Sequence, residues 1–270
     1  MNRDQVITSR QNSLVKLVRG LSSRRAREAE GIFVIEGHKV IHEALSSGVS
    51  PEKIIVSRRA LEHQMVTELV NSPDLNSEVI AVSDEVMEYM SEIDTPPGLL
   101  GLVRMPEAGL IALKTGPRAL LVIIDGVQDP GNVGTIIRAA DAFGADAVVT
   151  TVGCADIYNG KVLRAAMGSV FHLPVVRDAE PAELQELLKD RGITVAATSP
   201  GDNAISLSEA RLAWPLAVVF GSEARGVSPE FREAAGILVK IPMPGRAESL
   251  NVAVAAGITL YEACRQRGCT

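Results

Sequence analysis

A run of seven residues at 119–125, ALLVIID, constrains the fold of this chain more than any other feature. It is apolar until its final aspartate, which is typical of a strand buried on both faces of a parallel sheet. Further short apolar runs at 146–151, 193–199 and 215–221 are separated by segments with helical periodicity. Strands that alternate with helices predict an α/β unit whose mostly parallel sheet is covered by helices on both faces.

The same alternation divides the chain into two units. Residues 1–105 contain shorter apolar runs at 32–37, 53–57, 78–83 and 98–105, again separated by helical segments, and have the size of one α/β domain. Residues 106–118 hold two prolines and two glycines, so we expect a linker there. Residues 119–270 then form the second domain.

Composition excludes several classes of protein. A chain of 270 residues that is 46% hydrophobic can bury a core in each unit. No apolar run approaches the ~20 residues of a membrane-spanning helix, and the first residues lack the apolar core of a secretory signal. The three cysteines are scattered, which favours reduced thiols in a cytosolic protein. His38 and His42 have the spacing of a metal pair but no third ligand, so no metal is expected.

Charge is unevenly distributed around a net value of −6. Residues 1–27 carry seven Lys or Arg and one acidic residue, whereas residues 28–105 carry five basic and fourteen acidic side chains. A basic arm on an acidic body fits a phosphate-binding surface, and it fits a solvated helix face equally well. Aromatic residues make up only 3%, which disfavours a base-stacking platform.

Three glycine-bearing loops follow predicted strands, at 125–138, 220–228 and 241–251. Ligands of open α/β sheets bind beyond the carboxyl ends of the strands, so these loops are the natural candidates for a site. None is a dinucleotide fingerprint or a P-loop. No G-x-S-x-G elbow occurs and His172 has no evident triad partner, which disfavours a serine hydrolase.

The helix after the first loop is expected to begin at Asn132 as its N-cap and to end at Phe143. Its apolar residues form one stripe, and Arg138 falls on the opposite face beside Asp141. Arg138 therefore faces solvent, a cleft or another subunit. A surface ion pair with Asp141 is the simpler interpretation.

The last helix is expected to begin at Ser249 and is apolar on nearly every side, which predicts burial. Asn251 lies within its first turn. A buried amide without a hydrogen bond costs about 1–3 kcal/mol, so we expect a polar partner for Asn251, either backbone or ligand.

Taken together, the loops resemble the three motifs of the SpoU/TrmH branch of the SPOUT RNA methyltransferases. The matching residues are Asn132-x-Gly134-x-x-x-Arg138, Gly221-x-Glu223-x-x-Gly226 and Ile241-Pro242-Met243-x-Gly245-x-x-x-Ser249-Leu250-Asn251-Val252. More loosely, residues 9–16, 24–27 and 33–37 (SRQNSLVK, RRAR and FVIEG) resemble the family's ribosomal-protein-like RNA-binding domain.

The resemblance implies an S-adenosylmethionine-dependent RNA 2′-O-ribose methyltransferase that acts on large-subunit ribosomal RNA. Transfer RNA is the alternative substrate, and a catalytically silent RNA-binding factor is the alternative role. A small-molecule enzyme is disfavoured by the basic arm. The resemblance also implies a deep trefoil knot in the C-terminal segment and a homodimer.

Site residues carry over by motif position. The catalytic or substrate-positioning set is Arg138, Glu223, Ser249 and Asn251, and the cofactor-binding set is Thr198, Gly221, Ile241 and Leu250. The RNA-binding set has another basis: it takes Arg10, Lys16, Arg24, Arg25 and Arg27 from the basic arm, Arg225 and Arg246 from the motif loops, and Arg164 from a segment that resembles the family. An arginine is a poor proton acceptor, so we interpret Arg138 as a clamp on phosphate and hydroxyl, with the proton leaving through RNA phosphate or water.

Overall fold

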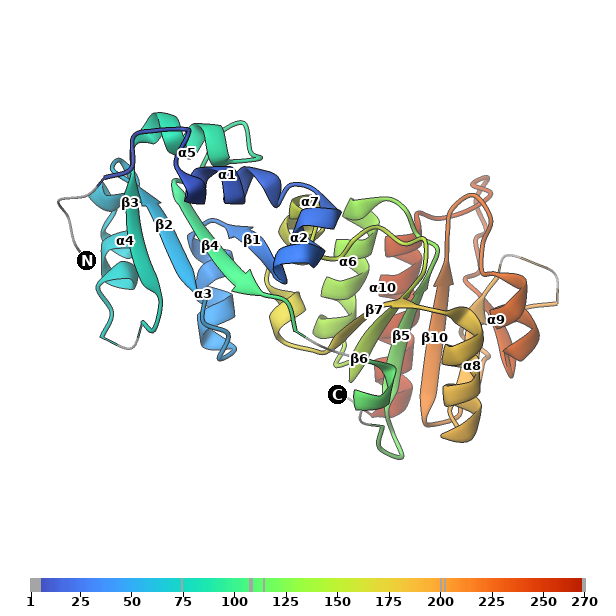
Figure 1. Ribbon diagram of the computed structural model, residues 1–270. Coiled ribbons are helices and arrows are strands. Elements are labelled where there is room, and N and C mark those ends of the chain that lie inside the picture. The colour runs from blue at the N-terminus through green and yellow to red at the C-terminus, as the bar shows by residue number, and fades with distance from the viewer. Residues whose placement is uncertain are drawn as a thin grey trace. The chain divides into compact units, whose positions relative to one another are not determined.

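The computed structural model describes residues 6–73, 75–106, 109–113, 115–199, 201 and 203–268 (Figure 1). Contacts divide the chain into two units. Unit 1 comprises Met1–Glu107 and Tyr158–Phe171, and unit 2 comprises Ala108–Ile157 and His172–Thr270. Nothing in the sequence pattern suggested that residues 158–171 would belong to unit 1.

Unit 1 is built on a mixed four-stranded sheet in the order β1-β4-β2-β3 (Figure 1). β4 is antiparallel to β1 and β2, while β2 and β3 are parallel. The strands are β1 (Ile32–Glu36), β2 (Lys53–Ser57), β3 (Glu78–Val82) and β4 (Leu99–Arg104). The helical elements are α1 (Ser13–Gly20), α2 (Arg24–Glu30), α3 (His38–Ser46), η1 (Ala60–Glu62), α4 (Gln64–Val70) and α5 (Asp84–Met90). Apolar residues of α1 and α5 share one core cluster with the sheet.

Residues 158–171 lie between the two stretches of unit 2 in the sequence, and they add α7 (Gly160–Ala166) and η3 (Ser169–Phe171) to unit 1. This segment is held by aromatic packing, since the Phe33 ring stacks on Tyr158 at 4.4 Å and on Phe171 at 6.4 Å between centroids. Backbone approach is also close, because a Cβ added at Gly168 would lie 2.7 Å from the Glu43 side chain. Gly168 has a φ of +96°, which few other residues adopt.

Unit 2 contains a seven-stranded sheet in the order β7-β6-β5-β10-β8-β11-β9 whose neighbouring strands all pair in parallel. The strands are β5 (Leu120–Asp125), β6 (Ala147–Thr151), β7 (Val175–Ala179), β8 (Thr194–Thr198), β9 (Ile205–Ser206), β10 (Leu216–Gly221) and β11 (Ile237–Lys240). The parallel sheet expected from the apolar runs is confirmed. The short edge strand β9 was not anticipated.

Helices cover both faces of this sheet (Figure 1). α6 (Pro130–Ala142) and α10 (Val252–Arg267) pack together on one face, and α8 (Pro181–Asp190) and α9 (Pro229–Ala234) lie on the other. The expected linker carries η2 (Leu110–Ala112). Leu110 and Leu113 are buried in the core of unit 2, so this stretch packs against the sheet instead of hanging free.

Two helix starts differ from expectation. α6 is capped by Asp129, whose side chain accepts a hydrogen bond from the Asn132 N–H at 2.8 Å, so Asn132 is the third residue of the helix. α10 is capped by Asn251 and not by Ser249, since Asn251 Oδ1 accepts from Ala253 and Val254 N–H at 2.9 and 3.2 Å. Asn251 is exposed, so it is not the buried amide that the sequence suggested.

The prediction that α10 would be buried all round is also wrong. Val254, Ile258 and Tyr261 are 51%, 40% and 60% exposed. Their i, i+4, i+7 spacing places them on one face of the helix. The opposite face, which includes Ala256 and Leu260, is buried.

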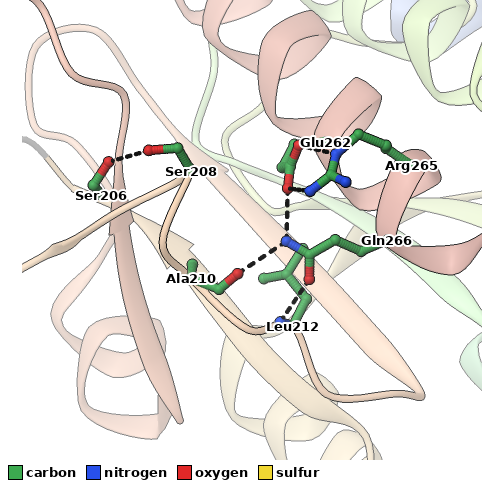
Figure 2. Close-up of polar contacts among 7 residues, drawn as sticks. All are labelled: Ser206, Ser208, Ala210, Leu212, Glu262, Arg265 and Gln266. Atoms are coloured by element: carbon green, nitrogen blue, oxygen red, sulfur yellow. Dashed lines mark hydrogen bonds and ion pairs between the residues drawn. The ribbon is translucent and has the colours of Figure 1, made fainter.

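The C-terminal half of α10 is tied to the chain that leads from β9 to β10 (Figure 2). Gln266 Oε1 accepts from Leu212 N–H at 3.0 Å, and Gln266 Nε2 donates to the Ala210 carbonyl at 2.9 Å and to Glu262 at 2.7 Å. One amide thus satisfies a donor and an acceptor of an irregular segment. The Arg265 guanidinium, hydrogen-bonded to Glu262, lowers the pKa of that carboxyl.

Candidate active site

The carboxyl ends of three neighbouring strands bring Thr198, Gly221 and Ile241 to one edge of the unit 2 sheet. β8 lies between β10 and β11, with Ala197 level with Val219 and Thr198 level with Val239. Parallel strands are about 4.8 Å apart, so the three strand ends span about 10 Å. This is the edge where open α/β sheets bind ligands.

The loop after β10 turns sharply back on itself. A Cβ added at Gly221 would lie 2.1 Å from the Gly226 carbonyl carbon, so the backbone occupies the space that any side chain would need. Gly226 has a φ of +68°, and its N–H donates to the Ser222 carbonyl at 2.7 Å. Both motif glycines are therefore required by the turn that presents Glu223.

Asp125, at the end of β5, holds neighbouring segments together at this edge of the sheet. It is 6% exposed, and its two oxygens accept from Ser228 N–H at 2.7 Å and from Thr151 Oγ1 at 3.1 Å. Thr151 Oγ1 also accepts from Gly126 N–H at 3.0 Å. One buried carboxylate therefore joins β5, β6 and the loop beyond β10. Sequence reasoning missed it, although an acid that ends a fully apolar strand was a usable signal.

Asn132 connects the three motif loops. Its Nδ2 donates to Glu223 Oε1, and its Oδ1 accepts from Asn251 Nδ2 at 2.9 Å. The direction of these bonds follows from the helix cap. Because Asn251 Oδ1 accepts two backbone N–H groups, its Nδ2 must face Asn132, which leaves the Asn132 Nδ2 for Glu223.

This relay supplies the polar partner expected for Asn251, and that partner is another motif residue. Glu223 enters it as an acceptor. Asn132 was expected only to cap a helix, and its central place in the relay was missed. The signal available was its place in the first motif.

Arg138 is exposed on α6, as its position opposite the apolar stripe predicted. Asp141 hydrogen-bonds His172 at 2.7 Å, and no ion pair or hydrogen bond of the Arg138 side chain is found among the residues described. Arg138 lies six residues beyond Asn132, about 9 Å along the axis and about 240° around it, so the two do not share a face. Arg138 is thus not brought to the relay of its own chain.

The third loop is open. In the described part of the chain, no backbone–backbone hydrogen bond involves residues 241–250, and Ser249 is exposed. Ile241 and Leu250 are half-buried at either end of this stretch. Peptide groups without protein partners beside apolar side chains can bind a flat, polar-edged ligand. Thr198 is used internally, since its Oγ1 donates to the Val219 carbonyl at 3.0 Å.

Most of the expected RNA-binding residues are exposed. Arg10 and Arg19 both lie over the Tyr89 ring, at 4.8 and 5.1 Å from its centroid, while Arg24 pairs with Glu28 at 2.8 Å. The remaining exposed members are Lys16, Arg25, Arg225 and Arg246. Arg164 is half-buried and belongs to unit 1. Arg3, part of the basic arm, lies outside the described residues.

Arg27 differs from the rest of the set. It is 4% exposed, and its Nη1 donates to the Leu21 and Ser22 carbonyls at 2.6 and 2.9 Å. The guanidinium therefore stabilises the turn between α1 and α2, and an RNA contact of Arg27 at the open surface conflicts with this burial, although Arg27 also lines a cavity of unit 1.

Among the described residues, no three His, Cys, Asp or Glu side chains cluster as metal ligands, and no helix has both the length and the apolar character to cross a membrane. Cys154 is a buried free thiol and Cys264 is half-buried, whereas Cys269 lies outside the described range. Burial raises the pKa of the Cys154 thiol, which donates to the Ile124 carbonyl at 3.1 Å.

Comparison with known families shows which family the chain belongs to. The pattern of the SpoU rRNA Methylase family matches residues 119–261, which include the strand ends and the relay. The chain belongs to the SpoU rRNA methylase family. A second pattern, the MRM3-like substrate binding domain, matches residues 12–101.

Relatives of this SpoU protein match over nearly the whole chain. A Bacillus subtilis 23S rRNA (guanosine(2553)-2′-O)-methyltransferase, RlmP, is 36% identical over 94% of this chain and 97% of its own length. A Streptomyces viridochromogenes 23S rRNA (uridine(2479)-2′-O)-methyltransferase is 32% identical over 97% and 92%. The crystal structure of the SpoU methyltransferase AviRb from the same organism, in complex with AdoMet, has a TM-score of 0.87 at 30% identity and covers 95% of this chain and 98% of that chain.

Proposed function

We propose that this SpoU protein transfers the methyl group of S-adenosylmethionine to a ribose 2′-hydroxyl of large-subunit ribosomal RNA. The relay from Glu223 through Asn132 to Asn251 carries this proposal, because it joins all three motif loops at the edge where open α/β sheets bind ligands. A catalytically silent protein would not be expected to keep all three side chains in one hydrogen-bonded arrangement.

The open loop supports S-adenosylmethionine as the cofactor. Peptide groups of residues 241–250 can hydrogen-bond adenine, with Ile241 and Leu250 as apolar walls and the ends of β8 and β10, at Thr198 and Gly221, as the floor. When bound, S-adenosylmethionine supplies an electrophilic methyl group on a sulfonium sulfur. The tight turn at Gly221 keeps the loop compact beneath it.

The protein's own residues position the ribose. The ribose oxygen forms a bond to the methyl carbon as the carbon–sulfur bond breaks, and the hydroxyl proton leaves to an RNA phosphate or water. Holding two reactants in line can lower the barrier by several kcal/mol. Glu223, Ser249 and Asn251 are proposed to bind the nucleotide, and Arg138 to clamp phosphate and hydroxyl.

A homodimer would let Arg138 reach a site. Arg138 lies away from the relay of its own chain. The helix that packs against α6, α10, has an exposed apolar stripe formed by Val254, Ile258 and Tyr261. We therefore propose that two copies pair through α10 and that Arg138 acts at the partner's site. Ile258→Glu should yield monomers in analytical ultracentrifugation with unchanged far-UV circular dichroism, whereas Ala182→Glu, on the exposed surface of α8 at the other face of the sheet, should not.

The C-terminal path of the chain supports the family's trefoil knot, which we include in the proposal. The chain leaves β11, two strands beyond β10, and returns along the carboxyl edge so that Asn251 meets Asn132 after β5. The Gln266 contacts with Leu212 and Ala210 hold the end of that return path (Figure 2).

Unit 1 is proposed to bind ribosomal RNA. Arg10 and Arg19 are held over Tyr89, which leaves cationic edges for phosphate, and Lys16 and Arg25 are exposed nearby in sequence. Substitution of Arg10 and Arg19 by Gln should weaken RNA binding and reduce its salt dependence. Deleting residues 1–27 is a poor test, because Val15, Val18 and Leu21 are buried in the core.

One experiment tests the function. The protein is incubated with labelled S-adenosylmethionine and either ribosomal or transfer RNA, and the label is mapped by nuclease digestion. We expect 2′-O-methylation of large-subunit ribosomal RNA in this assay. In the source cell, we expect the same reaction to take place in the cytosol. Transfer to transfer RNA alone would favour the alternative substrate. Cofactor binding without transfer to any RNA would leave only a silent RNA-binding factor.

A further inference from the structure

Unit 1 contains a cavity of about 480 Å³ that the proposed methyl transfer does not use. Every residue that lines it belongs to unit 1, including those contributed by the 158–171 segment. Its walls are mainly apolar, and charged groups gather where β1 ends and α3 begins. Cavities of about 300–1,000 Å³ with apolar walls and a few polar groups are typical of small-ligand sites.

The apolar walls are suited to a flat ring. Val34 of β1 and Leu100 of β4 line the cavity from the sheet, and Tyr158 lines it with a ring already fixed by stacking on Phe33 at 4.4 Å. Met65 and Met90 also line the cavity. Methionine side chains adapt to ligands of irregular outline, so a rigid aromatic wall faces adaptable ones.

Glu36 places a carboxylate in this cavity. Ser91 Oγ donates to Glu36 Oε1 and in turn accepts from Ile93 N–H at 2.9 Å, which fixes the carboxylate. Burial raises the pKa of Glu36, and no ion pair of Glu36 within 4 Å occurs among the residues described. A desolvated carboxylate without an ion pair is costly, and a ligand with N–H donors would offset that cost.

Arg164 brings donors to the same cavity. A Cβ added at Gly160 would lie 3.1 Å from Arg164 Nη1 and 2.8 Å from Glu92 Oε2, so the guanidinium and a second carboxylate converge above that glycine. Arg164 is also close enough to attract the Glu36 carboxylate electrostatically. The cavity thus offers fixed acceptors and a multivalent donor around an aromatic wall.

We propose that this cavity binds one unpaired nucleotide of the RNA substrate and prefers guanine. Guanine presents adjacent N1–H and N2–H donors that match a carboxylate, and O6 and N7 acceptors that match a guanidinium. Adenine, cytosine and uracil each lack that pair of adjacent donors. Proteins read RNA sequence mainly at unstacked bases held against aromatic rings. The inference rests on the proposed RNA substrate.

Methionine methyl groups allow a direct test in the full-length protein. Met65, Met90 and Met167 line the cavity, whereas Met243 lies in the third motif loop. We expect 5′-GMP at millimolar concentrations to shift the three cavity methyl signals in ¹³C spectra of methyl-labelled protein, more than AMP, CMP or UMP does. S-adenosylmethionine should shift Met243 instead. Silent cavity signals, or equal shifts with all four nucleotides, would overturn the proposal.

Glu36→Gln keeps the shape and the Ser91 bond but replaces one acceptor oxygen by an N–H donor. We expect it to weaken GMP binding about 5- to 150-fold, the range for loss of one bidentate base contact. Glu62→Gln, an exposed site outside the cavity, makes the same charge change and should have no effect. Arg164→Gln should also weaken GMP binding, which guards against a folding defect in one variant.

Methyl transfer separates this inference from the proposed function. Glu36→Gln should raise KM for ribosomal RNA and leave the affinity for S-adenosylmethionine unchanged. If the wild type transfers methyl groups but the cavity signals stay silent, the cavity inference alone fails. If the wild type transfers nothing while GMP shifts the cavity signals, the proposed function alone fails.

Discussion

The direction of the hydrogen bonds at Asn132 can be tested by exchanging two functional groups. Asn132→Asp replaces the amide N–H that donates to Glu223 by a second acceptor, so two carboxylates face each other. The bond to Asn251 survives, because that residue donates to Asn132 Oδ1. Adding Glu223→Gln restores a donor opposite the new carboxylate and returns the site to a single negative charge.

The magnitude follows from exposure. Two unit charges about 4 Å apart repel by about 1 kcal/mol in water and about 4 kcal/mol in a partly buried setting. A lost hydrogen bond to a charged group costs roughly 1.5–3 kcal/mol where it is buried. Glu223 and Asn251 are exposed and Asn132 is half-buried, so we take about 2 kcal/mol in total. If all of it is lost in the transition state, kcat/KM falls about 30-fold.

The assay is a thermodynamic cycle on kcat/KM with labelled S-adenosylmethionine and ribosomal RNA. Glu223→Gln alone should cost less than Asn132→Asp, because a Gln carbonyl still accepts from Asn132. The double variant should recover at least about 1.5 kcal/mol of the Asn132→Asp loss. Glu230→Gln, an exposed residue of α9, provides the matched control.

These bond directions are refuted if the double variant improves on Asn132→Asp in neither cofactor affinity nor turnover. Recovery of cofactor affinity without recovery of turnover would keep the relay and show that the Glu223 carboxylate itself contacts the reacting ribose.

Three other outcomes are expected. Arg138→Lys should retain part of the methyl transfer and Arg138→Ala should abolish it; equal loss in both, with cofactor binding intact, would replace the charge role by a role of guanidinium geometry. Glu36→Gln should stabilise the protein at neutral pH. Because the pKa of Glu36 is raised in the folded state, its contribution to stability is complete below the unfolded pKa near 4.5 and is lost as pH rises through the folded pKa. The gain in the free energy of unfolding from Glu36→Gln, measured with urea, should therefore shrink as pH falls toward 4.5. Gln266→Ala leaves the Leu212 N–H and Ala210 carbonyl without that partner and should lower the free energy of unfolding by about 1–3 kcal/mol, whereas Gln64→Ala in an exposed pair should change it little.

The parallel sheet could be predicted because burial on both faces leaves a simple record in sequence. Seven consecutive residues such as ALLVIID have few alternatives to a central strand. The placement of the motif residues at strand ends followed from that sheet. The short strand β9 left no such record, since two residues cannot show a period.

The predicted N-caps of α6 and α10 were wrong because each helix start offers two residues that can act as a cap. Asp129 and Asn132 are both good N-cap residues, but Pro130 occupies the first turn of α6, and proline is favoured directly after the cap. That signal pointed to Asp129. Ser249 and Asn251 are both capable caps two residues apart, and no proline distinguishes them.

Other features depend on contacts that sequence patterns do not contain. The burial of Arg27 depends on carbonyls of the turn before α2, and the membership of residues 158–171 in unit 1 depends on where Phe33 stacks. A basic residue near other basic residues looks the same in sequence whether it faces solvent or backbone. Only the fold separates Arg27 from Arg25.

Three carboxylates show how the fold assigns different roles to one chemical group. Asp125 is buried and bonded to Thr151 of β6 and to the loop after β10, Glu223 is exposed and bonded to one amide, and Glu36 is half-buried beside a cavity with its pKa raised. A 2′-hydroxyl is present in every nucleotide of RNA, so a site that positions ribose at the unit 2 sheet does not by itself choose the base. Selection then requires groups that read a base edge. In the described part of unit 1, the cavity around Glu36 and Arg164 offers such groups. Without a ligand, the desolvated Glu36 carboxylate lowers the stability of the folded state.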